Sequence, residues 1–297
     1  MRTSFSVNDM TIHRIVEQES GFTPMLDFLP TLSKETLDEN LAWLAPGGYD
    51  SASGNVVLCF QSYVVKTPHH NILVDSCIGN DKNFPLRPAW NKKTDGNWMS
   101  ALKAAGLGVE DIDFVMCTHL HVDHVGWNTR LDNGRWVPTF RNAQYVFSRE
   151  DYDFYQNLDK DPEKGPANGG SFRDSVLPVV EAGLAQMVTG AQALDESLKV
   201  EPAPGHTPGT IAIKFESKGE KALFCGDILH HALQVYHPEW NSFACLDRDN
   251  ARKSRRTALE HCAGTGARLL PCHFGAPFTC HIDAKADGFA PRFDGKF

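Results

Sequence analysis

Residues 115–128 of the chain read Val115-Met116-Cys117-Thr118-His119-Leu120-His121-Val122-Asp123-His124-Val125-Gly126-Trp127-Asn128. An apolar, strand-like run leads into four residues of metal-binding types within a span of six. His119 and His121 are two apart, so an extended backbone would point both side chains the same way. Asp123 and His124 follow in a turn that Gly126 helps to close, and they can aim elsewhere. One short loop could therefore serve two adjacent metal ions, and this interpretation is favoured over a chance grouping of ordinary residues.

The composition excludes several classes of protein. The chain has 297 residues, 41% apolar and 22% charged, which is ordinary for a globular protein. Its net charge of −8 argues against nucleic-acid binding, and no run approaches the ~20 apolar residues of a membrane span. Eight scattered cysteines without a Cys-x-x-Cys pair favour reduced thiols. Without a signal peptide, we expect a cytoplasmic protein with a small-molecule substrate; a homodimer is left open.

Strand and helix signals alternate along the chain. Strands are expected at 11–16, 56–65, 71–75, 111–117, 143–147, 198–200, 222–225 and 269–272, and helices at 34–43, 98–105, 174–182 and 249–263. The turn at 67–70 predicts an antiparallel hairpin, and Asn133-Gly134 predicts another. No linker is evident, so we predict a single domain over 1–297. Its N-terminal segment, 1–54, could cover a site as a lid.

Three later strands each end in a residue of a metal-ligating type. His206 lies in Gly205-His206-Thr207-Pro208-Gly209, Asp227 follows Gly226, and His273 precedes Phe274-Gly275. Alone, each histidine would more often be a hydrogen-bonded structural residue. The shared context of a strand end beside glycine favours metal ligands. Asp75 also ends a strand, and the sequence leaves open whether it supports a ligand or caps a turn.

The order of these motifs resembles that of the metallo-β-lactamase-fold hydrolase superfamily, from about residue 56 to His273. The resemblance implies an α+β fold, a four-layer αβ/βα sandwich with the metal site at the edge between two mixed β-sheets. It implies that His119, His121 and His206 hold one metal ion. Asp123, His124 and His273 would hold a second ion, and Asp227 would bridge both.

These donors fit a hydrolytic metal centre. Imidazole and carboxylate suit zinc, although iron, manganese or cobalt accept similar sets. Two divalent ions roughly 3.5–4 Å apart would share a bridging water and lower its pKa, so that hydroxide forms near neutral pH. The hydroxide would attack a carbonyl or phosphoryl centre, and the resemblance suggests that Asp123 carries the proton to the leaving group. No serine-nucleophile motif or phosphate loop is present.

The sequence is most similar to the acyl-homoserine-lactone lactonases and their organophosphate-hydrolase relatives. Asp227 stands where the commonest zinc β-lactamases carry Cys or Ser, which disfavours antibiotic hydrolysis. His230 occupies a position where many lactonases have a Tyr near the substrate carbonyl. It could donate a hydrogen bond or a proton to the leaving group, or be structural. Trp127, Trp90 and Tyr236 are predicted to line an apolar substrate pocket, with ordinary core filling as the alternative.

The sequence therefore predicts a dinuclear metal-dependent hydrolase, with zinc as the first choice, that acts on a small, apolar ester and specifically a lactone. A phosphotriesterase, an arylesterase or a hydrolytic dehalogenase with an aromatic substrate is the alternative among enzymes. A mononuclear iron enzyme of the same superfamily is a further alternative. From another class, the chain could be a non-catalytic protein that binds metal or ligand, although a complete ligand set argues against this.

Overall fold

The computed structural model describes residues 4–194, 196–275 and 277–293. The chain divides into two compact units, which differ in the sheet that forms most of each. Unit 1 comprises Met1–Gln18 and Phe60–Thr189, and unit 2 comprises Glu19–Cys59 and Gly190–Phe297. The division falls inside two long strands, β2 (Met10–Pro24) and β4 (Asn55–Lys66). That the chain forms a single domain stays a prediction.

Most strands of the eight-stranded sheet belong to unit 1, in the order β1-β2-β4-β5-β6-β9-β10, with β3 paired to β4. The remaining bounds are β1 (Ser4–Val7), β3 (Tyr49–Asp50), β5 (Asn71–Val74), β6 (Phe114–Met116), β9 (Gln144–Ser148) and β10 (Ala185–Val188). β4 and β5 form the predicted antiparallel hairpin. β5, β6, β9 and β10 run parallel, so the carboxyl ends of β5 and β6 meet at one edge of the sheet.

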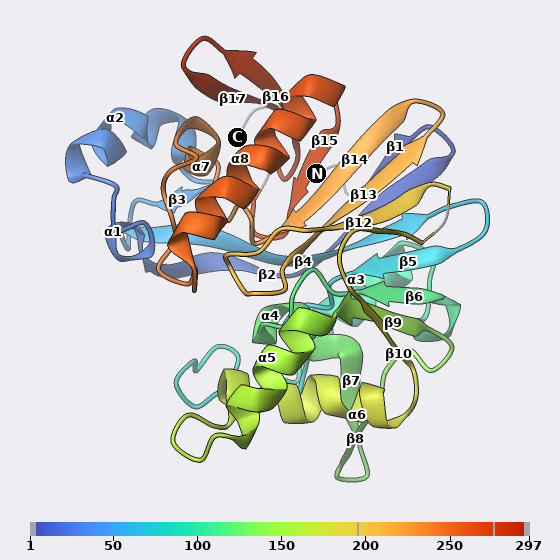
Figure 1. The fold of residues 1–297 in the computed structure, drawn as a ribbon. Coiled ribbons are helices and arrows are strands. Elements are labelled where there is room, and N and C mark those ends of the chain that lie inside the picture. Colours follow the sequence, from blue (N-terminus) through green and yellow to red (C-terminus); the bar gives the residue numbers. More distant parts are fainter. Residues whose placement is uncertain (1–3, 195, 276, 294–297) are drawn as a thin grey trace. The chain divides into compact units, whose positions relative to one another are not determined.

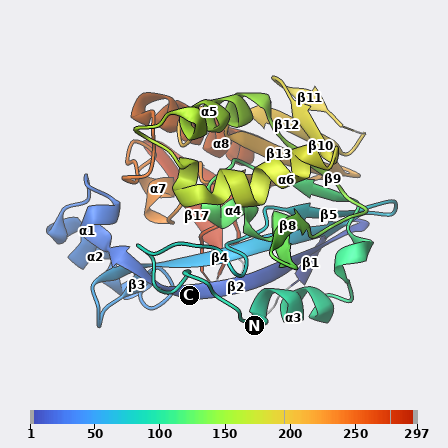
Figure 2. The same cartoon turned by 90° about the horizontal axis from the view of Figure 1, so that it is seen from below.

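Among its described residues, unit 1 has four α-helices: α3 (Asn97–Ala104), α4 (Val122–Val125), α5 (Arg149–Lys160) and α6 (Leu177–Glu181). Of these, α4 and α5 were not predicted from the sequence. The unit also has 3₁₀ turns at Val109–Asp111, Gly126–Asn128 and Ala167–Gly170. α5 lies beside α6 in both views (Figures 1 and 2). The helix predicted at 174–182 is a π turn, Phe172–Val176, that continues into α6. β7 (Thr129–Asp132) and β8 (Arg135–Pro138) form the predicted Asn133-Gly134 hairpin.

Unit 2 contains a seven-stranded sheet in simple sequence order. Its strands are β11 (Gln192–Ala193), β12 (Leu198–Pro202), β13 (Ile211–Ser217), β14 (Glu220–Gly226), β15 (Arg268–Pro271), β16 (Cys280–Lys285) and β17 (Gly288–Phe293). Only the β14–β15 pair is parallel among the pairs described. The crossover between these two strands contains α8 (Arg248–Thr265), which lies along the sheet against β14 and β16 (Figure 1).

Three shorter helices complete unit 2: α1 (Met25–Phe28), α2 (Lys34–Leu44) and α7 (Leu233–Tyr236). α8 buries Ala258, Leu259 and Cys262 against Leu223 and Leu269 of the sheet, which forms the core of this unit. Among the described residues, we find no helix with the length and apolar character needed to cross a membrane.

A close approach of two backbone segments fixes the loop that carries the His motif. Ser76 N donates to His124 O at 2.8 Å, Gly126 N donates to Cys77 O at 2.7 Å, and Trp127 N donates to Ser76 O at 2.9 Å. A Cβ atom at Gly126 would lie 1.9 Å from the carbonyl oxygen of Ile78. Only glycine therefore allows the two segments to pair at this position.

We expect Gly126→Ala to lower the free energy of unfolding by about 3 kcal/mol, because the paired segments must separate to admit the methyl group. Gly264→Ala in α8 is the matched control, since no other atom lies within 4 Å of its Cβ position. The control should change stability by less than about 1 kcal/mol. Chemical denaturation measures both values, and wild-type stability of Gly126→Ala would contradict the close approach.

Candidate metal centre

Asp75 holds the start of the His motif through three contacts. Thr118 N donates to Asp75 Oδ1 at 2.7 Å, and Thr118 Oγ1 donates to Asp75 Oδ2 at 2.8 Å. His124 Nδ1 lies 3.0 Å from the same Oδ2. All three side chains are almost completely buried. The sequence left open whether Asp75 supports a ligand or caps a turn. In the structure, Asp75 contacts the ring of His124, a predicted ligand.

The four ligand-type residues of the motif lie at the end of β6 and on α4. His119 Nε2 and His121 Nδ1 are 3.0 Å apart. Two nitrogen atoms bound to one tetrahedral zinc ion at about 2.0–2.1 Å would lie about 3.3 Å apart, so these two donors have the spacing for a shared ion. Asp123 and His124 follow on the single turn of α4, with Asp123 Oδ2 3.9 Å from His124 Nε2.

α5 holds the backbone between the first two histidines. Leu120 N donates to Asp151 Oδ2 at 3.1 Å, and Asn168 Nδ2 donates to Leu120 O at 2.8 Å. The Tyr155 ring, also on α5, lies 6.0 Å from the ring of His121. Asp151, Asn168 and Tyr155 were not predicted from the sequence. A signal was present, because Ser148 followed by acidic residues is typical of a helix start, and its side chain accepts from the backbone N–H groups of Glu150 and Asp151.

In unit 2, three imidazoles converge on one carboxylate. His206 Nε2 lies 3.1 Å and His230 Nε2 lies 3.2 Å from Asp227 Oδ2, and His273 Nε2 lies 3.0 Å from Asp227 Oδ1. All four side chains are at least 95% buried. Asp227 leaves the sheet at an irregularity in the β14–β15 pairing, where Gly226 has a φ of 47°. The strand ends of this unit thus bring together His206, Asp227 and His273, as predicted, and add His230.

Four of the five predicted ligand histidines have a polar group beside Nδ1. The Thr118 hydroxyl lies 3.2 Å from His119 Nδ1, and the Asp75 carboxylate lies beside His124. The Cys59 carbonyl oxygen lies 2.9 Å from His273 Nδ1, and the Cys245 thiol lies 3.9 Å from His206 Nδ1. A metal-bound histidine usually donates its second N–H to such an acceptor, which fixes the tautomer and the ring direction. These four rings are therefore oriented to offer Nε2.

The Asp227 carboxylate and burial act in opposite directions on the neighbouring histidines. Burial by itself would lower the pKa of His206, but the charge of Asp227 and the hydrogen bond to it raise this pKa to about 9. Burial lowers the pKa of His230 to about 3, and Asp227 only partly offsets this effect. The charge of Asp227 therefore outweighs burial at His206, whereas burial outweighs this charge at His230.

The predicted pocket residues have different surroundings. Trp127 is buried, its ring stacks on Trp98 with centroids 5.5 Å apart, and its Nε1 donates to Glu17 Oε1 at 2.8 Å. Trp90 is buried between Phe60 and Phe84. Tyr236 is 43% exposed and lies edge-on to Trp43. A substrate role for these three residues stays a prediction, and the contacts of Trp127 and Trp90 are those of core side chains.

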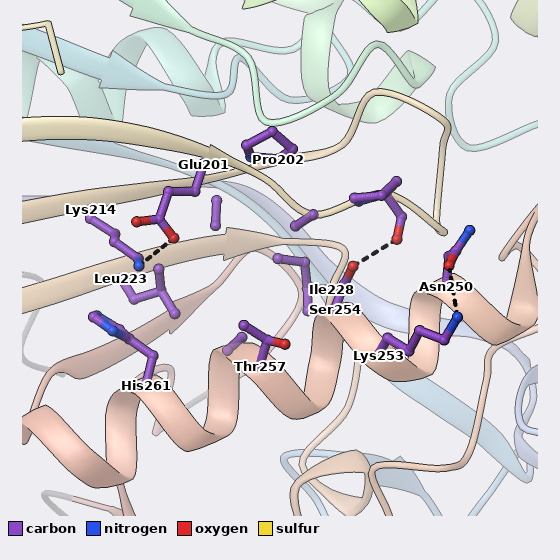
Figure 3. Close-up of a pocket in the computed structure, with 14 residues that line it drawn as sticks. Glu201, Pro202, Lys214, Leu223, Ile228, Asn250, Lys253, Ser254, Thr257 and His261 are labelled. Atoms are coloured by element: carbon purple, nitrogen blue, oxygen red, sulfur yellow. Dashed lines mark hydrogen bonds and ion pairs between the residues drawn. The ribbon is translucent and has the colours of Figure 1, made fainter. Parts of the chain in front are cut away.

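A separate cavity of about 180 Å³ lies between α8 and strands β12–β14 (Figure 3). None of the predicted site residues lines it. Two contacts lie within its wall: Lys214 Nζ lies 2.5 Å from Glu201 Oε2, and Ser254 Oγ donates to Pro204 O at 2.7 Å. The first contact joins β13 to β12, and the second joins α8 to the turn before His206.

Comparison with known proteins places the chain in a family. A model of the metallo-beta-lactamase superfamily matches residues 61–273, and the chain belongs to this superfamily of metallo-hydrolases. It is 27% identical over 135 residues to the uncharacterized protein YobT of Bacillus subtilis (strain 168). That match covers 44% of this chain and 52% of YobT, so the chain spans about half the length of the curated relative.

Two solved structures show the same fold. The hydrolase AbOPH of the beta lactamase superfamily has a TM-score of 0.81 at 22% identity, covering 99% of this chain and 97% of that chain. AidC, a dizinc quorum-quenching lactonase, has a TM-score of 0.77 at 21% identity, with coverage of 99% and 97%. These likenesses confirm the predicted fold class, the α+β fold of the metallo-β-lactamase superfamily.

We expect Asp75→Asn to weaken zinc binding about 10–100-fold, because the amide cannot accept all three hydrogen bonds and His124 loses its orientation. Asp113→Asn is the matched control, since the Asp113 carboxylate, just before β6, also accepts a backbone N–H, from Asn71 at 2.7 Å, but does not contact a predicted ligand in any described hydrogen bond. Competition with a chromophoric chelator measures the affinities. Equal zinc affinity in the Asp75 variant and the wild type would contradict a supporting role for Asp75.

Proposed function

We propose that the protein is a dinuclear metal-dependent hydrolase that cleaves a small, apolar ester or lactone. The observation that carries the proposal is the orientation of the ligand-type histidines, four of which have Nδ1 beside an acceptor-type group. A histidine that served only packing would not need Nε2 directed toward other ligand-type groups. The complete donor set favours an enzyme over a protein that merely stores a metal.

The ligand roles follow from the order of the family motifs within the matched region. In this proposal His119, His121 and His206 hold one divalent ion, with zinc as the first choice. Asp123, His124 and His273 hold a second ion, and Asp227 bridges the two. The short distances between donor atoms within each unit support these roles. When bound, the ions activate a water molecule and polarise the scissile carbonyl.

Two side chains of the chain itself would assist the reaction. Asp123 lies on α4 with a side chain that is 15% exposed, compared with 1% for His124, so it can carry a proton to the leaving group. His230 has a buried Nδ1 without a hydrogen-bond partner among the described residues. A substrate oxygen is a suitable partner for this atom. Phe28 of the N-terminal segment lies edge-on to His230, which supports the proposal that this segment covers the substrate.

A lactone is the first candidate substrate because AidC, which shares the fold over nearly the whole chain, is described as a quorum-quenching lactonase. His230, where many lactonases have Tyr, is the specific observation that favours a second candidate, an aryl ester or a phosphotriester. An imidazole can assist a good leaving group by a hydrogen bond without the phenol of tyrosine.

We expect metal analysis to find two divalent ions per chain, and a panel of lactones, aryl esters and phosphotriesters to show turnover with the metal-loaded protein. Asp227→Ala should lose bound metal and activity together, because both ions depend on this carboxylate. Activity that survives in Asp227→Ala would contradict the bridging role. One ion per chain would contradict the dinuclear centre, and two bound ions without turnover would support the non-catalytic alternative.

We expect His230→Phe to lower kcat about 10–100-fold while both ions stay bound, because the variant removes a hydrogen bond to the substrate and no ligand. His231→Phe is the matched control, since His231 is equally buried but contacts the Gly48 carbonyl at 3.2 Å instead of Asp227. Steady-state kinetics and elemental analysis of both variants measure the outcome. Loss of a metal ion in His230→Phe would show that His230 is a ligand instead.

A further inference from the structure

The segment that precedes α8 is built around the turn of His206. Leu246 N donates to His206 O at 3.1 Å, and Asp247 N donates to Gly205 O at 2.8 Å. A Cβ atom at Gly205 would lie 2.0 Å from the backbone nitrogen of Ala251, so the turn and the helix start are in direct contact. Any side chain that faces His206 from this segment therefore has a fixed position.

Two side chains of the segment reach the imidazoles beside Asp227. Cys245 Sγ lies 3.9 Å from His206 Nδ1. Ser242 Oγ lies 3.5 Å from His230 Nε2 and 3.6 Å from Cys245 Sγ. Both side chains are buried, and together they form a short polar chain from one imidazole to the other within unit 2. Neither residue was predicted from the sequence to belong to the site.

A buried arginine keeps this segment in place from the other side. Arg255 of α8 is fully buried. Its guanidinium donates to Ile228 O at 2.9 Å, to Trp240 O at 2.7 Å and to Pro238 O at 2.8 Å. These bonds connect the residue after Asp227 with the loop that leads to Ser242. The positions of Asp227 and Cys245 are therefore set by the same side chain.

We propose that Cys245 is the positioning residue of His206: its sulfur accepts the Nδ1–H hydrogen bond and directs Nε2 toward the metal ion. This inference rests on the proposed dinuclear centre and assigns one more residue to it. The analogous partners of His124 and His273 are a carboxylate and a backbone carbonyl, which accept hydrogen bonds more strongly than sulfur does. Of these three predicted ligands, His206 thus has the weakest hydrogen-bond acceptor beside Nδ1. We therefore expect a chelator to remove the ion at His206 first.

Three variants test the proposal: Cys245→Ala, Cys245→Ser and the control Cys262→Ala. Cys262 is a buried thiol of α8 that packs in the core of unit 2 with Leu223 and Leu269. Zinc affinity is measured by chelator competition, and cobalt-loaded protein is measured by its visible absorption spectrum. Cys245→Ala should lower the affinity for one of the two ions about 10–100-fold and alter the visible spectrum of the cobalt-loaded protein. Cys245→Ser should retain the affinity within about threefold, because its hydroxyl also accepts a hydrogen bond.

The outcomes separate this inference from the proposed function. Wild-type protein that binds fewer than two ions would overturn the dinuclear centre itself. Two ions in the wild type, with unchanged affinity and spectrum in Cys245→Ala, would overturn only the role of Cys245. An equal loss in Cys262→Ala would also overturn it, because the effect would then follow from removal of any buried thiol in this unit. Failure of Cys245→Ser to restore binding would exclude hydrogen bonding as the cause.

Discussion

A buried imidazole binds a metal ion well only if its ring direction is fixed before the ion arrives. In each unit, one buried carboxylate contacts one or more predicted ligands in a way that meets this requirement. In unit 1 the Asp75 carboxylate orients the ring of His124. It also accepts a hydrogen bond from the hydroxyl of Thr118, which lies beside His119 Nδ1. In unit 2 the Asp227 carboxylate gathers His206, His230 and His273. Both carboxylates are buried, so their hydrogen bonds are strong and their loss would be costly.

These contacts require two pairs of backbone segments to approach each other more closely than a side chain would allow. Gly126 allows the loop after β5 to pair with the end of α4, and Gly205 allows the His206 turn to touch the start of α8. Helices then hold the loops from outside: Asp151 of α5 binds the backbone between His119 and His121, while Arg255 of α8 binds the residue after Asp227. The predicted ligands therefore lie on short loops, but regular elements determine the positions of those loops.

The groups that support the histidines differ in chemical character. A hydroxyl, a carboxylate, a carbonyl and a thiol stand beside Nδ1 of His119, His124, His273 and His206, respectively. A negatively charged acceptor makes an imidazole a stronger donor to a metal ion than a neutral one does. Two ions held by such unequal supports would differ in affinity, and the ion of His206 would exchange more readily than the ion of His124.

Local sequence is enough to predict candidate metal donors because donor type, spacing and adjacent glycines are properties of a few consecutive residues. The hairpin of β4 and β5, the Asn133-Gly134 turn and the long helix α8 were predicted for the same reason. The partners of the ligands were not, because Asp151, Cys245 and Arg255 meet the motifs only across long separations in sequence. For Trp127, the place beside the motif predicts a pocket residue, which stays a prediction, and only the fold reveals that its ring stacks on Trp98 and that its Nε1 donates to Glu17. Local sequence specifies which atoms can bind a metal ion, and only the packed strands and helices specify what holds those atoms in position.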